Sequence, residues 1–383
     1  MKIRFLIAGI CTLWLSARAE AATCAAPPKA MVIEVPGRPF AAVATADNCW
    51  LFVSLVTERD QGAIAVLRNQ DGAFGLDHTM SLQSSVFGAA LTHDGKLLLA
   101  AAGDTSMALD VAALEQGDSG KALLGSFRNG VKSGAIYAAV SGDDKLLFVS
   151  DERAQRISVF DLAKARSDGF QSLAPVGRIP MGIAPVGLAL SPDKQWLYAT
   201  SQVAAAPANA PSSCKAEDGS GRMHPEGLLV RVDVAKAATD PAHAAVAALP
   251  AGCNPVRVVV SPSGKRIWVT ARGDNALLSY AAGDWSAVSS HASYTSYPIG
   301  TSPVGVAVRP DEKQVWVALS NRFGKPDEGE VAGLAFGADA SSTKRMSAQA
   351  GGFPRETAFL PDGRTLVVTL FDAKRVKLIP TPD

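Results

Sequence analysis

Short apolar segments separated by polar turns recur along the whole chain. The best-preserved copies, SPDKQWLYATSQ, SPSGKRIWVTAR, RPDEKQVWVALS and LPDGRTLVVTLF, begin at residues 191, 261, 309 and 360. An apolar segment such as PVGLALS precedes the turn, and an alternating segment such as RISVFDL (156–162) or LLVRVDV (228–234) often follows. Segments of this length, with turn residues between them, predict short antiparallel β-strands.

The turns repeat with a period of about 50 residues, which is typical of propeller blades that each form one sheet. One interval is longer, because residues 203–227 form an Ala/Pro-rich and then polar insertion. The aligned turn positions are Asp47, Asp94, Asp143, Asp193, Ser263, Asp311 and Asp362.

Each unit ends in a weaker fourth segment, as in RIPMGIAP and SYPIGTSP, and no helical stretch separates the units. The pattern predicts an all-β fold, a seven-bladed β-propeller of four-stranded blades in one domain over residues 22–383. After the last turn only two strands follow, at 365–370 and 375–380. MVIEVPGRP has the form of a fourth strand, so we expect residues 31–35 to complete the seventh blade and close the ring.

The aromatic–Val–Thr pattern that follows the SPDGK-like turns resembles the YVTN-repeat β-propellers, which are related to lactonase-like seven-bladed propellers. The resemblance covers nearly all of residues 22–383 and implies the fold more strongly than an activity. Lactonase-like propellers carry a P-R-H motif and an N-E-L motif. Here FPRETAFLPDG matches at Arg355, has Glu356 in place of His, and is followed by VVTLFD without N-E-L.

Residues 1–21 have the pattern of an export signal. Lys2 and Arg4 precede the apolar stretch FLIAGICTLWL, and small residues allow cleavage after Ala19 or Ala21. No later segment reaches the 18 apolar residues of a transmembrane helix, so we expect a periplasmic or secreted protein with no membrane anchor. With 37 basic and 36 acidic residues, the chain gives no general basis for binding nucleic acid.

Removal of the signal takes one of the five cysteines with it, and the even remainder predicts two disulfides in an exported chain. In a propeller, loops joining strands two and three share a face with the blade-to-blade loops. Cys214 and Cys253 lie in such loops, whereas Cys24 and Cys49 belong to the opposite face. We therefore expect Cys24–Cys49 and Cys214–Cys253, with free thiols as the alternative.

First strands line the channel of a propeller, and the aligned third residues of the P-V-G segments predict a ring near its mouth. Small residues would leave room, whereas Tyr137, Arg257 and Glu356 would place a phenol, a cation and an anion there, and Arg355 a second cation. These residues indicate either a polar ligand pocket or a structural ion pair. The ring comprises Ala41, Gly88, Tyr137, Gly187, Arg257, Gly305 and Glu356.

Charged connections between second and third strands should surround this mouth, and they are either solvated tips or ligand contacts. The tripeptide RGD at 272–274 is expected to be a tight turn. The insertion, held by Cys214–Cys253, is expected to be a lid, a docking arm or an inert loop. The candidate rim residues are Arg59, Arg153, Arg272, Arg322 and His224.

We expect a ligand-binding or protein-interaction scaffold that acts through the channel-mouth face as a monomer, without a cofactor or a metal. Its partner would be a small anionic or hydroxylated molecule, or a cell-envelope protein or polymer. The alternative is a lactonase-like hydrolase or isomerase of a small lactone or sugar acid, with Glu356 as base and Arg257 or Arg355 as oxyanion clamp. Replacing Arg257 or Glu356 by Ala is expected to abolish binding with little loss of stability.

Overall fold

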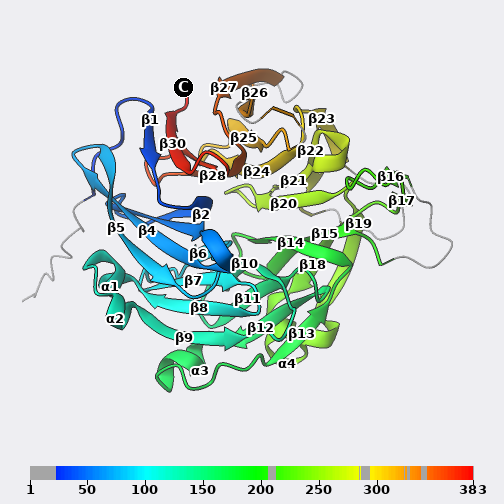
Figure 1. Cartoon of the computed structure of the whole chain (residues 1–383). Coiled ribbons are helices and arrows are strands. Elements are labelled where there is room, and N and C mark those ends of the chain that lie inside the picture. The colour runs from blue at the N-terminus through cyan, green and yellow to red at the C-terminus, as the bar shows by residue number, and fades with distance from the viewer. Residues whose placement is uncertain are drawn as a thin grey trace, which may run out of the picture.

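The computed structural model describes residues 23–205, 213–283, 285, 294–322, 324–325, 328–337 and 343–382. The proposed signal at 1–21 and residues 206–212 of the insertion lie outside this part of the chain. Seven four-stranded antiparallel sheets form a ring, which is the predicted seven-bladed propeller (Figure 1).

Each blade follows the predicted order of a first strand, a turn, and three further strands. Blade 1 contains β2 (Arg38–Ala44), β3 (Trp50–Val56), β4 (Gly62–Gln70) and β5 (Ala73–Leu82). Blade 2 contains β6 (Ala89–Leu91), β7 (Leu97–Ala102), β8 (Thr105–Asp110) and β9 (Leu123–Arg128). Blade 3 contains β10 (Ala135–Val140), β11 (Leu146–Asp151), β12 (Arg156–Asp161) and β13 (Gly177–Pro180).

The later blades keep this order, although an insertion interrupts blade 4. Blade 4 contains β14 (Ile183–Leu190), β15 (Trp196–Val203), β18 (Leu228–Asp233) and β19 (Ala245–Pro250), with the hairpin β16 (Cys214–Lys215) and β17 (Met223–His224) between its middle strands. Blade 5 contains β20 (Pro255–Val260), β21 (Arg266–Ala271), β22 (Ala276–Ala281) and β23 (Tyr294–Pro298). Blade 6 contains β24 (Pro303–Val308), β25 (Gln314–Leu319), β26 (Glu330–Phe336) and β27 (Thr343–Gln349).

The ring closes as the sequence predicts. Blade 7 contains β28 (Pro354–Phe359), β29 (Thr365–Leu370) and β30 (Arg375–Pro380). Its fourth strand is β1 (Met31–Glu34), which pairs antiparallel to β30 with Met31 opposite Leu378, and the two strands lie side by side in Figure 1. N- and C-terminal segments therefore share one sheet.

Within the described residues no helix separates one blade from the next, as the sequence predicts, but short helices occur inside blades 2, 3 and 4. Four short helices follow third strands: α1 (Val111–Glu115), α2 (Ser119–Ala122), α3 (Leu162–Ser167) and α4 (Val234–Thr239). Three of them begin after an Asp that ends the third strand, and its carboxylate accepts a hydrogen bond from a backbone N–H of the first turn, as Asp110 does from Ala113 at 2.8 Å. The Asp is an N-cap signal that the strand pattern concealed.

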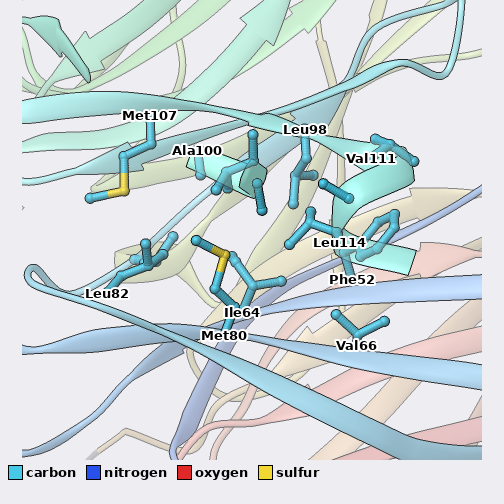
Figure 2. Packing of buried hydrophobic residues seen from close by; sticks show 14 of the residues in the cluster. Phe52, Ile64, Val66, Met80, Leu82, Leu98, Ala100, Met107, Val111 and Leu114 are labelled. Carbon is cyan, nitrogen blue, oxygen red and sulfur yellow. The ribbon is translucent and has the colours of Figure 1, made fainter. Parts of the chain in front are cut away.

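Blades are held together by apolar side chains packed between neighbouring sheets. Between blades 1 and 2, Phe52, Ile64 and Met80 face Leu98 and Met107 (Figure 2). Helix α1 adds Val111 and Leu114 to the same cluster. Similar clusters occupy the other interfaces, so each sheet buries both faces and the core forms a ring around the channel.

Both predicted disulfides are present. The Cα atoms of Cys24 and Cys49 lie 5.0 Å apart, and those of Cys214 and Cys253 lie 5.4 Å apart. Two disulfides favour an oxidising, exported location. Within the described residues, no helix has the length and apolar character needed to cross a bilayer.

Candidate functional site at the mouth of the channel

A row of hydroxyl groups ties each first strand to the neighbouring blade. The Thr200 hydroxyl accepts a hydrogen bond from the backbone N–H of Gly187 at 2.9 Å and donates one to the carbonyl of Val256 in blade 5 at 3.0 Å. Thr200 occupies the Thr position of the aromatic–Val–Thr pattern that recurs along this chain. The same bridging position is filled by Ser54, Ser150, Thr270 and Thr369 in other blades.

Opposite this hydroxyl, the first strand usually bulges, and the bulge contains the predicted ring position. Pairing shifts between Pro185 and Leu188 in blade 4 and between Pro255 and Val258 in blade 5. Bulges redirect side chains at the rims of sheets. In blade 5 the redirected residue is Arg257, a buried charged residue.

The small ring residues have a different role from the predicted one. A Cβ on Gly187 would lie 2.6 Å from the carbonyl oxygen of Val256, and one on Gly305 would lie 2.7 Å from the Cα of Glu356. These glycines allow the next blade to approach closely, instead of widening the channel.

Arg257 and Glu356 form an ion pair between blades 5 and 7. The Arg257 Nε donates to Glu356 Oε1 at 2.7 Å, and Nη2 donates to the same oxygen. Arg257 is only 4% exposed to solvent and Glu356 only 7%. Burial lowers the pKa of Arg257, but the charge and hydrogen bond of Glu356 together with Tyr137 and Glu152 outweigh it, so the net pKa is raised. The structural ion pair anticipated from the sequence is therefore present.

Two aromatic rings pack against this ion pair at the channel mouth. We call Arg257, Glu356, Tyr137 and Phe40 together the brace. The Arg257 guanidinium lies 4.6 Å from the centroid of the Tyr137 ring and 5.9 Å from that of Phe40. Burial raises the pKa of Tyr137 to about 12, and the charge of Glu356 adds to the effect, so the phenol stays protonated at neutral pH.

A cavity of about 180 Å³ adjoins Arg257 and is lined by residues of the first strands and of the strand-two-to-three connections. Its apolar wall is formed by residues that precede the ring positions, among them Ile136, Val186, Val256 and Val304. The aromatic ring of Phe353 also lines the cavity. The polar lining residues are Glu152, Gln202, Arg257, Arg272, Arg322 and Arg355.

Arg355 differs from the other residues in its row, which are apolar. Its guanidinium lies 3.9 Å from the centroid of the Phe40 ring and 5.2 Å from that of Phe371. Its buried Nε has no hydrogen-bond partner, and Arg355 forms no ion pair with the described residues. Burial lowers its pKa to about 9, and the like charge of Arg257 adds to this, yet the group remains cationic at pH 7.

The insertion is fastened to the edge of the cavity. Arg272 Nε lies 2.9 Å from both carboxylate oxygens of Glu217, and its Nη2 donates to Gln202 Oε1 at 3.1 Å. The Cys214–Cys253 disulfide fixes the hairpin beside the same connection. The RGD sequence forms the expected tight turn, a single 3₁₀ turn at Arg272–Asp274.

The structure separates the candidate residues into distinct groups. Arg257, Arg272, Arg322 and Arg355 line the cavity, whereas Tyr137 and Glu356 belong to the brace and are not among its lining residues. Arg153 is exposed, Arg59 lines another groove beside Arg38 and Lys374, and His224 lies in the hairpin with Nδ1 2.7 Å from the carbonyl of Pro225.

Glu152 and Gln202 line the cavity but were missed among the charged and polar loops of the sequence. Both directly follow the residue that pairs with a first strand at the point where its bulge begins, as Arg272 does. Aligning the ends of the second strands would have singled them out. Because first strands and second-strand ends meet at one mouth, both rows deserve inspection in such repeats.

The arrangement is chemically suited to binding. Glu356 is engaged twice by Arg257 and does not line the cavity, so it is poorly placed to remove a proton from a molecule held there. Several guanidinium groups around a small cavity are suited to an anionic group. No group of three His, Cys, Asp or Glu that could hold a metal occurs among the described residues.

No protein-family model matches the chain, and no curated protein matches it in sequence. Solved structures do resemble it. A chain of Kuenenia stuttgartiensis hydrazine synthase is similar with a TM-score of 0.67 and 15% identity, over 91% of this chain and 97% of that one. A chain of the mitotic checkpoint complex is similar with a TM-score of 0.66 and 14% identity, over the full length of both. At such identities the likeness shows the fold alone.

Proposed function

We propose that this chain is an exported YVTN-type propeller that binds a small anionic molecule in the channel-mouth cavity. The observation that carries the proposal is Arg355, a cation that lines the cavity without an acidic partner in the described chain. A partly buried charge without a counter-charge is costly, and a bound carboxylate or phosphate would supply one. The periplasm or the extracellular space is the proposed location.

The other guanidinium groups support this role in different ways. Arg257 is neutralised by Glu356 and Arg272 by Glu217, yet both still line the cavity and keep unused N–H donors. Arg355 therefore supplies the attracting charge, and its neighbours add hydrogen bonds. The small apolar wall would contact the uncharged part of the ligand.

The test is a thermal-shift and calorimetric titration with acetate, propionate, malonate and inorganic phosphate. At 100 times its dissociation constant, a bound anion should stabilise the native protein by about 2.7 kcal/mol. Arg355→Met removes the charge but keeps an elongated side chain, so the stabilisation should disappear. Arg59→Met, in another groove, is the matched control and should respond like the wild type.

Equal responses of wild type and Arg355→Met would contradict the proposal. A panel without any response would also contradict it and would favour the docking of a cell-envelope protein or polymer on this face.

A further inference from the structure

The cavity also contains an unpaired acidic side chain. Glu152 directly follows β11 in blade 3 and lines the cavity, but its carboxylate forms no ion pair or hydrogen bond within the described chain. Of the two cations that follow it closely in sequence, Arg153 is exposed and forms no ion pair with Glu152 in the described chain, and Arg156 Nε donates to Asp151 at 3.1 Å. Asp151 is itself held by Asn129 and Ser158. Glu152 is therefore open to a ligand.

Glu152 and Arg355 line the same cavity from blades that are far apart in the ring. The lining runs through blades 3 to 7, with Glu152 in blade 3 and Arg355 in blade 7. In a ring of seven, no two blades are further apart than these. Glu152 acts electrostatically on both Arg257 and Arg355, which agrees with its position on the same cavity. The cavity is thus lined by one charge of each sign, Glu152 and Arg355, that forms no ion pair within the described chain.

One side of the lining between these two residues is apolar and can contact an uncharged spacer, while Gln202, Arg257, Arg272 and Arg322 make the rest of it polar. Val186, Val256 and Val304 form an apolar cluster, with Ile136 packed against it. The other cations that the argument uses, Arg257 and Arg272, already have carboxylate partners. A ligand carrying only negative charge would satisfy Arg355 but would leave Glu152 desolvated and unpaired beside it.

We propose that the ligand is a small zwitterion, an amino acid or a related molecule with an ammonium and a carboxylate group. The carboxylate binds Arg355 and the ammonium group binds Glu152, with the apolar wall covering the carbon chain between them. This inference rests on the proposed anion-binding function and adds the positive group that the ligand must carry. It also explains why a site rich in arginine retains an acidic residue without a protein partner.

The experiment uses calorimetric titration of the exported chain with matched probes. Glycine, β-alanine, 4-aminobutanoate and 5-aminopentanoate vary the distance between the charges, and acetate, propionate, butanoate and pentanoate lack the ammonium group. The best amino acid should bind at least tenfold more tightly than the carboxylate of the same chain length. Glu152→Gln should reduce this preference to parity, and Glu58→Gln, on an exposed acidic residue of another groove, should retain it.

Charge reversal gives a second, independent measurement. Glu152→Lys should bind glutarate better than 5-aminopentanoate, reversing the order of the wild type. Because Glu152 is only partly buried, both variants should fold, which their melting curves will verify. Equal binding of amino acids and plain carboxylates by the wild type, or an unchanged preference in Glu152→Gln, would overturn the zwitterion and leave anion binding intact. If the wild type bound none of the carboxylates or amino acids, the proposed function itself would be overturned.

Discussion

Single charged residues have different roles at the channel mouth, although the sequence presents them as one group. Arg257 and Glu356 are 99 residues apart in the chain, yet they form a buried ion pair. Arg355, beside Glu356 in sequence, has no such partner. The sequence marked Arg257 and Glu356 as departures from a ring of small residues, and Arg355 as a second cation beside them. It could not assign the charges to partners, because pairing depends on side-chain directions across the ring.

The sequence led us to expect that replacing Arg257 or Glu356 would leave stability nearly unchanged. Because both residues are buried, we now expect a clear loss of stability. Arg257→Met or Glu356→Gln should lower the free energy of unfolding by about 3 kcal/mol, because each leaves the other charge or its hydrogen-bonding groups buried without a full partner. The double variant Arg257→Met/Glu356→Gln should lose less than the sum of the single losses. Chemical denaturation of all three measures this coupling, and strictly additive losses would exclude a coupled pair.

At the scale of the element, the repeated motif connects blades through hydrogen bonds as well as through apolar packing. The hydroxyl of Thr270 accepts from the N–H of Arg257 at 3.0 Å and donates to the carbonyl of Val304 at 2.8 Å. Blades 2 and 6 have Ala101 and Ala318 at this position. The sequence showed that the position recurs, whereas its partners became visible only when neighbouring blades were placed side by side.

Thr270→Val should therefore lower the free energy of unfolding by about 1–3 kcal/mol, because it leaves a buried N–H and a buried carbonyl without this partner. Thr270→Ser keeps the hydroxyl and should lose clearly less. Thr343→Val, on the exposed strand β27, is the control and should change little. Urea titrations compare the three variants, and a loss in Thr270→Ser equal to that in Thr270→Val would rule out the hydroxyl as the cause.

The whole molecule depends on the closure of its ring by a short strand. β1 belongs to blade 7, but the segment before it is anchored to blade 1 by the Cys24–Cys49 disulfide. The Asn69 side chain supports this segment by donating to the carbonyl of Ala25 at 2.8 Å. The N-terminal segment thus connects the first and last blades, whereas Cys214–Cys253 fixes an insertion at the edge of the cavity.

Removal of the two disulfides should therefore have unequal effects on stability. Chain entropy favours a slightly larger contribution from Cys214–Cys253, since its cysteines are 39 residues apart against 25 for Cys24–Cys49. Ring closure predicts the opposite order of stability losses, because Cys24–Cys49 helps to join the first and last blades. Cys24→Ser/Cys49→Ser should lower the free energy of unfolding by about 2–4 kcal/mol, and Cys214→Ser/Cys253→Ser by less. Calorimetric melting of both variants tests this, and the reverse order would argue against ring closure as the cause.

The sequence by itself determined the fold, because a strand pattern repeated every 50 residues or so can bury both faces of each sheet only when the units stack. It also determined the closing strand, the disulfide pairs and the ring of candidate residues, since topology assigns each repeat position to one place on the propeller. The sequence pattern did not predict the short helices, because a capping Asp at the end of a strand also resembles an ordinary turn residue.

Only the tertiary structure decided which charges are satisfied. Arg272 is neutralised by Glu217 from an insertion whose path no repeat specifies, while Glu152 and Arg355 face the same cavity without protein partners. Strand patterns report burial and alternation, which are local properties. Charge pairing depends on distances of a few ångströms between residues far apart in the chain, and closure of the ring sets those distances.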